Sequence, residues 1–275
     1  MNIRSRAAQM LAAVKRQAAS RSHLRLFNGK MLPLSEAQQQ YEAVRRQGDS
    51  MAVDNAQTAS SGKLLCNHYL ANALAEDTLG IWALDAGTLN FLEEEIQTKR
   101  PRFILEFGAG VSTLCFARYM MEAGHPSSTP CVFSIEQNEW QIEKSRERLE
   151  ELGLSPFVRL LHAPVERRCL EGIDAECYAL SEQTLAAFFG EARMDWIVID
   201  GPSGDGLTRF GTLPLVKEYA SKQTVFFLDD ALRTEEMEVA NLWSLLPYVH
   251  NIQLCFRGKG IWIGELNFPS GERVS

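Results

Sequence analysis

Several features that would place a protein at a membrane or in an oxidising compartment are missing from this sequence. No apolar run approaches the roughly 20 residues that a membrane-spanning helix needs, and there is no signal-peptide core. The six cysteines include no Cys-x-x-Cys pair, which argues against a zinc site and against a disulfide framework. We therefore expect a cytoplasmic protein without a membrane span.

Acidic residues are absent from positions 1–35, which carry seven Lys/Arg, whereas residues 36–275 hold 21 Lys/Arg against 35 Asp/Glu. The acidic body argues against a nucleic-acid substrate bound by a basic surface. The sequence also lacks an Asn/Asp-Pro-Pro-aromatic motif, which would bind a base flipped out of a nucleic acid. The Arg-, Ala- and Ser-rich start suits either an organelle presequence or a basic helix that lies on the body or on a partner.

Composition divides the chain into two parts. Residues 1–62 are predicted to form a basic helical arm and a polar linker, because 36–62 are rich in Gln, Ala and Ser and poor in large apolar side chains. Residues 63–275 are predicted to form one α/β domain, with a helical lead-in at 63–100 and a core sheet at 101–266. A hydrophobic content of 45% suits an ordinary globular core.

From residue 102 the predicted strands alternate with helices, which indicates a doubly wound, mostly parallel sheet with helices on both faces. The apolar runs that predict strands lie at 103–107, 131–136, 157–161, 196–200 and 224–228. A closing hairpin is expected from 252–256 and 260–263. Residues 166–180 show no clear pattern.

The first of these strands runs into a glycine turn and a helix start. Gly108 and Gly110 permit a tight turn and let a ligand approach the bare backbone. Ser112 or Thr113 can cap the following helix, whose free N–H groups would point at that ligand. A dinucleotide fingerprint has a third glycine where this chain has Thr113. The pattern is therefore Glu-x-Gly-x-Gly, with Glu106 at the strand end.

Acidic residues stand at the ends of four predicted strands: Glu106, Glu136, Asp200, Asp229 and Asp230. In doubly wound sheets ligands bind outside the carboxyl ends of the strands. Packing does not explain acids there, because a strand end needs no carboxylate. Glu136 lies where a carboxylate would accept the ribose hydroxyls of a cofactor; a solvated strand-end acid is the alternative.

Asp200, Asp229 and Asp230 are expected to converge on one edge of the sheet. Carboxylates at such short distances from one another need a cation between them or a raised pKa. Mg²⁺ would relieve the repulsion and could lower the pKa of a substrate hydroxyl. In the alternative, Asp229 or Asp230 caps the next helix and pairs with Arg233 or Arg209. Arg233, at a helix N-terminus, either neutralises these acids or holds an anionic substrate.

Over about residues 64–265 the chain resembles the class I S-adenosylmethionine-dependent methyltransferases. Residues 106–110 look like their first motif and Glu136 like the acid of the second, while 200–202 and 228–230 look like the motifs after the fourth and fifth strands. The family's fold is a seven-stranded sheet with one reversed strand, which the closing hairpin would supply. The last two motifs are most similar to metal-dependent O-methyltransferases of small molecules.

This resemblance implies an enzyme that transfers a methyl group from S-adenosylmethionine to an oxygen of a small molecule or sugar. Mg²⁺ is expected as a second cofactor, and Arg233 suggests that the acceptor is anionic. The implied cofactor contacts are Glu106, Gly108, Ala109, Gly110, Ser112, Thr113, Glu136, Gln137, Trp140, Ala163, Pro164 and Asp200. The implied catalytic residues are Asp200, Asp229, His68 and Arg233, and the implied metal ligands are Asp200, Asp229 and Asp230.

Two alternatives remain open. One is a different enzyme on the same fold, such as an aminopropyl transferase or a nicotinamide-dependent dehydrogenase; Thr113 in place of glycine weighs against the dehydrogenase. The other is a non-catalytic cofactor-binding module that acts through its N-terminal arm. The acids at the strand ends weigh against this module, since a site without chemistry has no need of them.

Overall fold

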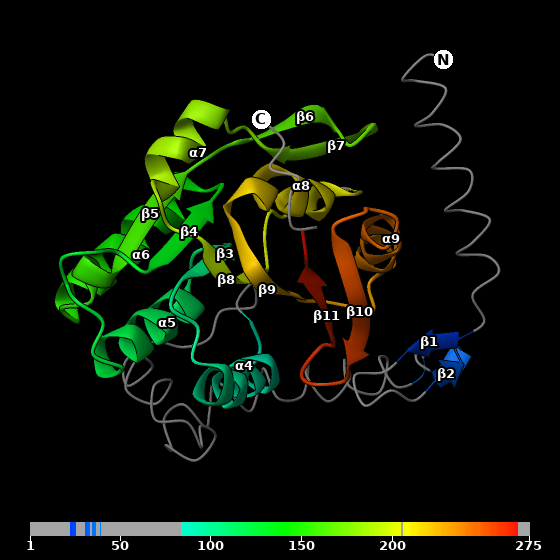
Figure 1. Ribbon diagram of the computed structural model, residues 1–275, viewed down its shortest axis with the longest axis horizontal. Helices are drawn as coiled ribbons and strands as arrows, with labels where there is room; N and C mark the ends of the chain where they lie inside the picture. Colours follow the sequence, from blue (N-terminus) through cyan, green and yellow to red (C-terminus); the bar gives the residue numbers. More distant parts are fainter. Residues whose placement is uncertain are drawn as a thin grey trace.

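A seven-stranded sheet runs through the middle of the molecule (Figure 1). The computed structural model describes residues 84–204 and 206–268, and in the N-terminal part 23–25, 31–33, 35–36 and 39. The strand order is β10-β11-β9-β8-β3-β4-β5. The strands are β3 (Ile104–Phe107), β4 (Val132–Glu136), β5 (Val158–His162), β8 (Met194–Ile199), β9 (Ala220–Leu228), β10 (Val249–Cys255) and β11 (Ile261–Leu266).

Five neighbouring strands of this sheet, from β5 to β9, are parallel, and β11 runs antiparallel to both of its neighbours, β9 and β10. The mostly parallel seven-stranded sheet predicted from the sequence is confirmed, and the closing hairpin supplies the reversed strand. That strand lies inside the sheet between β9 and β10. Its direction brings the β10–β11 turn to the edge where β9 ends.

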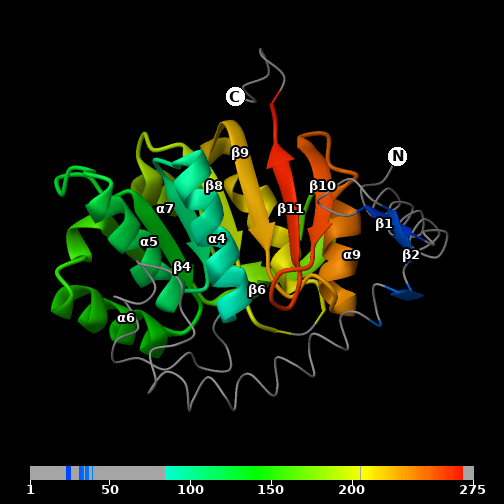
Figure 2. The ribbon, with the colours of Figure 1, turned by 90° about the horizontal axis from the view of Figure 1, so that it is seen from below.

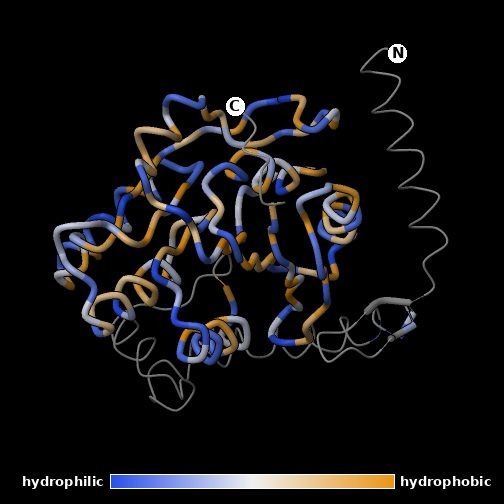
Figure 3. The backbone as a smooth tube through the Cα atoms, viewed as in Figure 1, coloured by the Kyte–Doolittle hydropathy of each residue, from blue (hydrophilic) through white to orange (hydrophobic). Residues whose placement is uncertain are grey.

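Helices cover both faces of the sheet (Figures 1 and 2). One face packs against α4 (Ala86–Lys99), α5 (Val111–Glu122) and α6 (Glu139–Glu151). The other packs against α7 (Glu182–Phe189), α8 (Thr212–Val216) and α9 (Thr234–Trp243). Figure 3 shows hydrophobic stretches along the central strands and hydrophilic ones mostly at the periphery.

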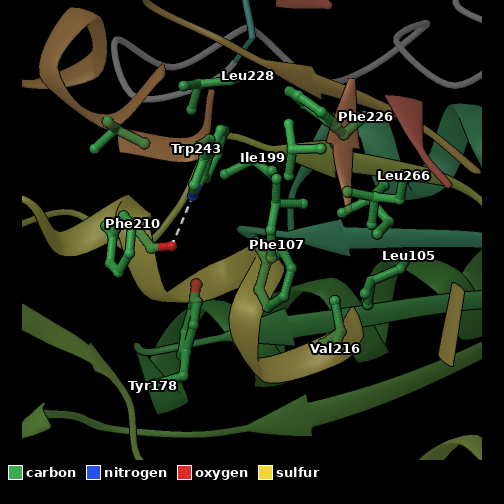
Figure 4. Packing of buried hydrophobic residues seen from close by; sticks show 14 of the residues in the cluster. Leu105, Phe107, Tyr178, Ile199, Phe210, Val216, Phe226, Leu228, Trp243 and Leu266 are labelled. Carbon is green, nitrogen blue, oxygen red and sulfur yellow. Dashed lines mark hydrogen bonds between the residues drawn. The ribbon is translucent and has the colours of Figure 1, made fainter. Parts of the chain in front are cut away.

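The two apolar cores follow from the side-chain alternation of the central strands. In β3, Ile104 belongs to the core under α4 and α5, whereas Leu105 and Phe107 belong to the opposite core. Figure 4 shows Phe107 in that second core, near Tyr178 and the pair formed by Phe210 and Trp243. The indole N–H of Trp243 donates to the Phe210 carbonyl at 2.9 Å. Buried on both faces, β3 is a rigid support for the turn that follows it.

Residues 166–180, which carry no clear sequence pattern, mostly form the hairpin of β6 (Val165–Leu170) and β7 (Ile173–Tyr178). Its turn, Glu171-Gly172, has φ of 49° and 77°, the positive values that a two-residue hairpin turn requires. The hairpin packs on the 3₁₀ helix η2 (Thr208–Gly211), so closely that a Cβ on Gly211 would lie 2.5 Å from the Cys177 Cβ.

Near the N-terminus, β1 (His23–Arg25) pairs antiparallel with β2 (Met31–Pro33), within the segment expected to be a helical arm. The Asn28-Gly29 dipeptide between them is a common hairpin-turn pair. The other arm and linker positions up to 62, apart from 35–36 and 39, lie outside the described residues, and so does the lead-in before residue 84. Within the part that the structure describes, no helix is long and apolar enough to cross a membrane.

Candidate functional site

A cavity of about 660 Å³ lies where β3, β4, β8 and β9 end. This is the edge at which open α/β sheets bind their ligands, and the volume is within the usual range for small-molecule sites. Its walls come from the glycine turn, the start of α6 and the loops after β8 and β9. The lining residues are Leu84, Gly108, Ala109, Gly110, Val111, Ser112, Glu136, Gln137, Asn138, Trp140, Gln141, Lys144, Asp200, Gly201, Ser203, Arg209, Asp230, Arg233 and Lys259.

The glycine turn brings bare backbone to the cavity. Gly108 has a φ of +99°, and a Cβ there would lie 3.2 Å from the Gly201 amide nitrogen, so the turn packs directly on the loop after β8. A Cβ on Gly110 would meet no atom within 4 Å, which leaves open space beside this residue. The Gly110 N–H donates to the Thr113 hydroxyl at 3.0 Å. The start of α5 is therefore held in place and faces the cavity with its first residues.

Glu106 supports this turn from behind. Its carboxylate accepts hydrogen bonds from the Thr113 hydroxyl at 2.5 Å and the Ser134 hydroxyl at 3.1 Å. The residue is fully buried, and the loss of solvation raises its pKa to about 7. Neither Glu106 nor Thr113 is among the lining residues. The structure therefore places both next to the predicted cofactor contacts but behind the cavity wall.

Glu136 lies at the end of β4 with a fixed carboxylate. One oxygen accepts from the Ala109 N–H at 3.0 Å and the other from the Asn138 N–H at 2.8 Å. Burial raises its pKa, although both backbone donors oppose that effect. The residue lines the cavity, so a carboxylate of defined orientation is available to a pair of ligand hydroxyls.

The outer rim of the cavity is polar and partly aromatic. Gln137 and Ser203 exchange two hydrogen bonds, from the Ser203 N–H to the Gln137 side-chain oxygen at 2.7 Å and from the Gln137 amide to the Ser203 carbonyl at 3.1 Å. Trp140 is 71% exposed, and the Lys144 ammonium lies 5.4 Å from its ring centroid. Ala163 is buried and Pro164 exposed, and neither lines the cavity.

The three predicted aspartates do come together. Asp200, Asp229 and Asp230 each offer a carboxylate oxygen within 4.8 Å of the others. Asp200 and Asp230 line the cavity, whereas Asp229 lies behind them and accepts the Thr88 hydroxyl of α4 at 3.2 Å. Burial raises the pKa of Asp200 to about 7, against the opposing effect of Arg209. Burial and the two neighbouring aspartates raise the pKa of Asp229 well above its usual value.

Basic side chains already surround these acids. Arg209, only 5% exposed, places Nη2 3.5 Å from Asp200 Oδ1 and 3.3 Å from Asp230 Oδ2. Arg233 Nη1 lies 2.9 Å from the same oxygen of Asp230, and Lys259 Nζ lies 3.7 Å from the other. The pairing of Asp230 with Arg209 and Arg233, one of the sequence-based alternatives, is therefore present.

The donor set fits a divalent ion poorly. Carboxylate oxygens are suitable ligands, and Asp229 Oδ2 and Asp230 Oδ1 are buried without a hydrogen-bond partner. However, a guanidinium nitrogen lies between Asp200 and Asp230, where an ion shared by these two acids would lie. Mg²⁺ binds its oxygen ligands at about 2.0–2.1 Å, which would place two cations side by side. The glycine turn and Glu136, by contrast, suit an adenosine cofactor.

Five basic or polar residues of the cavity were not among the predicted contacts: Asn138, Gln141, Lys144, Ser203 and Lys259. Lys259 belongs to the β10–β11 turn and reaches the site only because β11 is reversed. The reversed strand of the predicted closing hairpin could have indicated that Lys259 lies at this edge of the sheet. Arg209, which the sequence suggested as a partner of Asp229 or Asp230, also lines the cavity. His68 lies outside the described residues.

Comparison with known proteins agrees with this architecture. Residues 105–231 match the family model described as a methyltransferase domain. No curated protein is similar enough in sequence to count as a match.

Two solved structures share the fold. An O-methyltransferase from Bacillus cereus in complex with SAH is 19% identical, with a TM-score of 0.52 over 77% of this chain and 96% of that one. The O-methyltransferase TomG from Streptomyces achromogenes, involved in tomaymycin synthesis and in complex with SAM, is 17% identical, with a TM-score of 0.50 over 78% and 96%. Residues 105–231 therefore form a methyltransferase domain, and the seven-stranded sheet with one reversed strand is the architecture expected of class I S-adenosylmethionine-dependent methyltransferases.

Proposed function

We propose that this enzyme transfers the methyl group of S-adenosylmethionine to a hydroxyl oxygen of an anionic small molecule or sugar. One observation carries the proposal: a single cavity joins the glycine turn and Glu136 to the polar cluster at Asp200, Arg209 and Asp230. The cofactor half and the reactive half of a methyltransferase site would thus share one space. Two O-methyltransferases that share the fold were solved in complex with SAH and SAM, which supports the cofactor assignment.

The chain's own groups would align the reactants and accept a proton. Bound S-adenosylmethionine supplies a methyl group on a positively charged sulfur, which keeps the bonding electron pair when the acceptor oxygen attacks. Asp200 lies on the cavity wall with a pKa raised to about 7, so its carboxylate can take the hydroxyl proton near neutral pH. The glycine turn and Glu136 would hold the cofactor, which makes the transfer effectively intramolecular.

The acceptor would be anionic because basic side chains line the cavity beyond Asp200. Arg233 is 42% exposed at its side chain, and Lys259 and Lys144 also face this space. Carboxylate or phosphate groups are the ligands that such side chains bind. The acidic body of the chain argues against nucleic acid as the acceptor. A cytoplasmic location belongs to the same proposal and is supported by the five described cysteines, all of them unpaired.

Assistance by Mg²⁺ is the other mode that these residues suggest. Asp200, Asp229 and Asp230 would hold the ion, which would lower the pKa of the acceptor hydroxyl. The position of Arg209 weighs against this mode, so no step above uses an ion.

Cofactor titration with matched variants tests the proposal. We expect S-adenosylmethionine to bind the wild type in calorimetry, and Glu136→Gln to weaken binding roughly tenfold or more, because a charged hydrogen-bond acceptor is lost. Glu139→Gln, exposed on α6 and not among the lining residues, should bind like the wild type. A panel of hydroxylated carboxylates and sugar phosphates should then yield a methylated product by mass spectrometry.

Each failure has a distinct meaning. No binding of S-adenosylmethionine or its demethylated product would contradict the cofactor assignment. Binding without methyl transfer to any member of the panel would favour the non-catalytic module. A product that gains an aminopropyl group would favour the other transferase.

A further inference from the structure

We infer that Arg209 is the resident cation of the aspartate cluster and positions Asp200, so that this enzyme transfers methyl groups without a divalent ion. The inference rests on the proposed O-methyl transfer at this site. It reassigns the role expected for Mg²⁺ to a side chain of the chain itself.

Backbone contacts show that Arg209 joins two strand ends. From η2 its Nη2 donates to the Asp200 carbonyl at 2.7 Å and its Nη1 to the Asp229 carbonyl at 3.2 Å. These carbonyls directly follow β8 and β9. A planar guanidinium can bond both at once, which the point charge of a lysine cannot do with the same geometry. The side chain therefore fixes the segments that carry the acids.

Side-chain contacts place the same guanidinium among the carboxylates. Nη2 lies between Asp200 Oδ1 and Asp230 Oδ2, and Nη1 lies 3.5 Å from Glu236 Oε1. An ion that bridged Asp200 and Asp230 would have to displace this group. Asp229 does not line the cavity and accepts the Thr88 hydroxyl at Oδ1, so an ion that entered from the cavity would meet Asp200 and Asp230 first.

Three of the four acids of the cluster are balanced by ion pairs without a metal ion, and the fourth, Asp229, accepts the Thr88 hydroxyl. The acids Asp200, Asp230 and Glu236 contact three cations, Arg209, Arg233 and Lys259. A divalent ion would add two positive charges at a place where buried charge is already compensated.

The backbone of Arg209 is anchored, which fixes the point from which its side chain reaches the cluster. The Thr212 hydroxyl donates to the Arg209 carbonyl at 2.8 Å, and the Trp243 indole donates to the carbonyl of the next residue, Phe210 (Figure 4). Gly211 packs against Cys177 of the β6–β7 hairpin. These contacts hold η2 in place, and the bonds to the Asp200 and Asp229 carbonyls hold the guanidinium.

Mn²⁺ binding measured by electron paramagnetic resonance on the full chain tests this inference. The wild type should show no site with a dissociation constant below about 1 mM, the weak end for oxygen-ligated ions. Arg209→Met should bind Mn²⁺ at least roughly tenfold more tightly, because removing the cation leaves the carboxylates uncompensated. Asp200→Asn in the Arg209→Met background should abolish that gain.

Arg146→Met is the matched control, since it removes the same charge from an exposed ion pair with Glu143 and should leave Mn²⁺ binding unchanged. Tight Mn²⁺ binding by the wild type that Asp200→Asn abolishes would overturn the inference, and so would weak binding by both the wild type and Arg209→Met. Should Arg209→Met fail to fold, Arg209→Gln replaces it with the same expectation, because it also removes the charge but keeps a hydrogen-bond donor.

A second measurement separates this inference from the proposed function. Titration of S-adenosylmethionine with EDTA present should give the affinity measured without it. Absence of cofactor binding under both conditions would contradict the proposed function. The role of Arg209 as the resident cation would then still be tested by Mn²⁺ binding. Methyl transfer that stops with EDTA and returns with Mg²⁺ would instead overturn the ion-free reaction alone.

Discussion

Glu106 is a carboxyl group whose protonation depends on whether the chain is folded. Burial raises its pKa from 4.5 to about 7. Below pH 4.5 the group is protonated in both states and costs nothing. Between pH 4.5 and 7 the folded state keeps a proton that the unfolded state releases, so stability falls as pH rises. Above pH 7 the buried charge costs on the order of 3 kcal/mol.

Glu106→Gln should remove this pH dependence. The free energy of unfolding of the variant minus that of the wild type should be larger at about pH 8 than at about pH 4. The increase should be on the order of 3 kcal/mol. Urea unfolding at both pH values measures the difference. The amide oxygen can still accept from Thr113 and Ser134, so the packing is kept. Glu139→Gln, at an exposed position, serves as the control; an equal effect of Glu106→Gln at both pH values would contradict the assignment.

Two loops meet at the rim of the cavity through Gln137 and Ser203, and both line it. Gln137→Ala removes both hydrogen bonds. Each is worth about 1 kcal/mol at most at an exposed position, so S-adenosylhomocysteine should dissociate roughly fivefold faster. Stopped-flow displacement measures this rate. Gln141→Ala, which alters the same cavity from α6, should change the rate less; equal effects would show that the loop contact has no special role.

The β10–β11 turn is seated on the start of α4. Gly258 has a φ of +55°, and a Cβ there would collide with the Asp85 carboxylate, which caps α4 and accepts the Lys259 N–H at 2.7 Å. Gly258→Ala should therefore lower the free energy of unfolding by about 2–3 kcal/mol, through strain and a displaced cap. Thermal and urea unfolding measure the loss.

Gly153→Ala is the matched control for Gly258→Ala. Its φ is +68°, but a Cβ there would meet no atom within 4 Å, so only the backbone strain of about 1 kcal/mol is expected. Equal losses for the two variants would mean that contact with Asp85 contributes nothing.

At the scale of the whole molecule, the order of the sheet decides which segments share the site. The methyltransferase-domain match covers residues 105–231, yet Arg233 and Lys259 lie beyond it and line the cavity. They reach it because Arg233 is the N-cap of α9, three residues after Asp230, and β11 returns antiparallel along β9. The glycine turn, in the middle of the sheet, supplies the opposite wall.

Features that arise from neighbouring residues could be predicted from the sequence. Alternating apolar runs and helix signals predicted the parallel sheet, and the glycine turn and strand-end acids predicted the edge that carries the site. Parallel strands end at the same edge, so residues at strand ends converge without further information. The hairpin at residues 165–178 was missed because its short strands, charged on one face, give a weak pattern.

Which of the predicted side chains face the cavity depends on how distant segments pack together in three dimensions. Asp229 and Asp230 are adjacent, but the left-handed backbone of Asp230, with a φ of 55°, turns the second toward the cavity while the first contacts Thr88. Glu106 likewise lies behind its own turn. Arg209 and Lys259 come from segments distant in sequence. Which cation compensates buried acids depends on these three-dimensional distances, because charge interactions act through space and leave no local pattern in the chain.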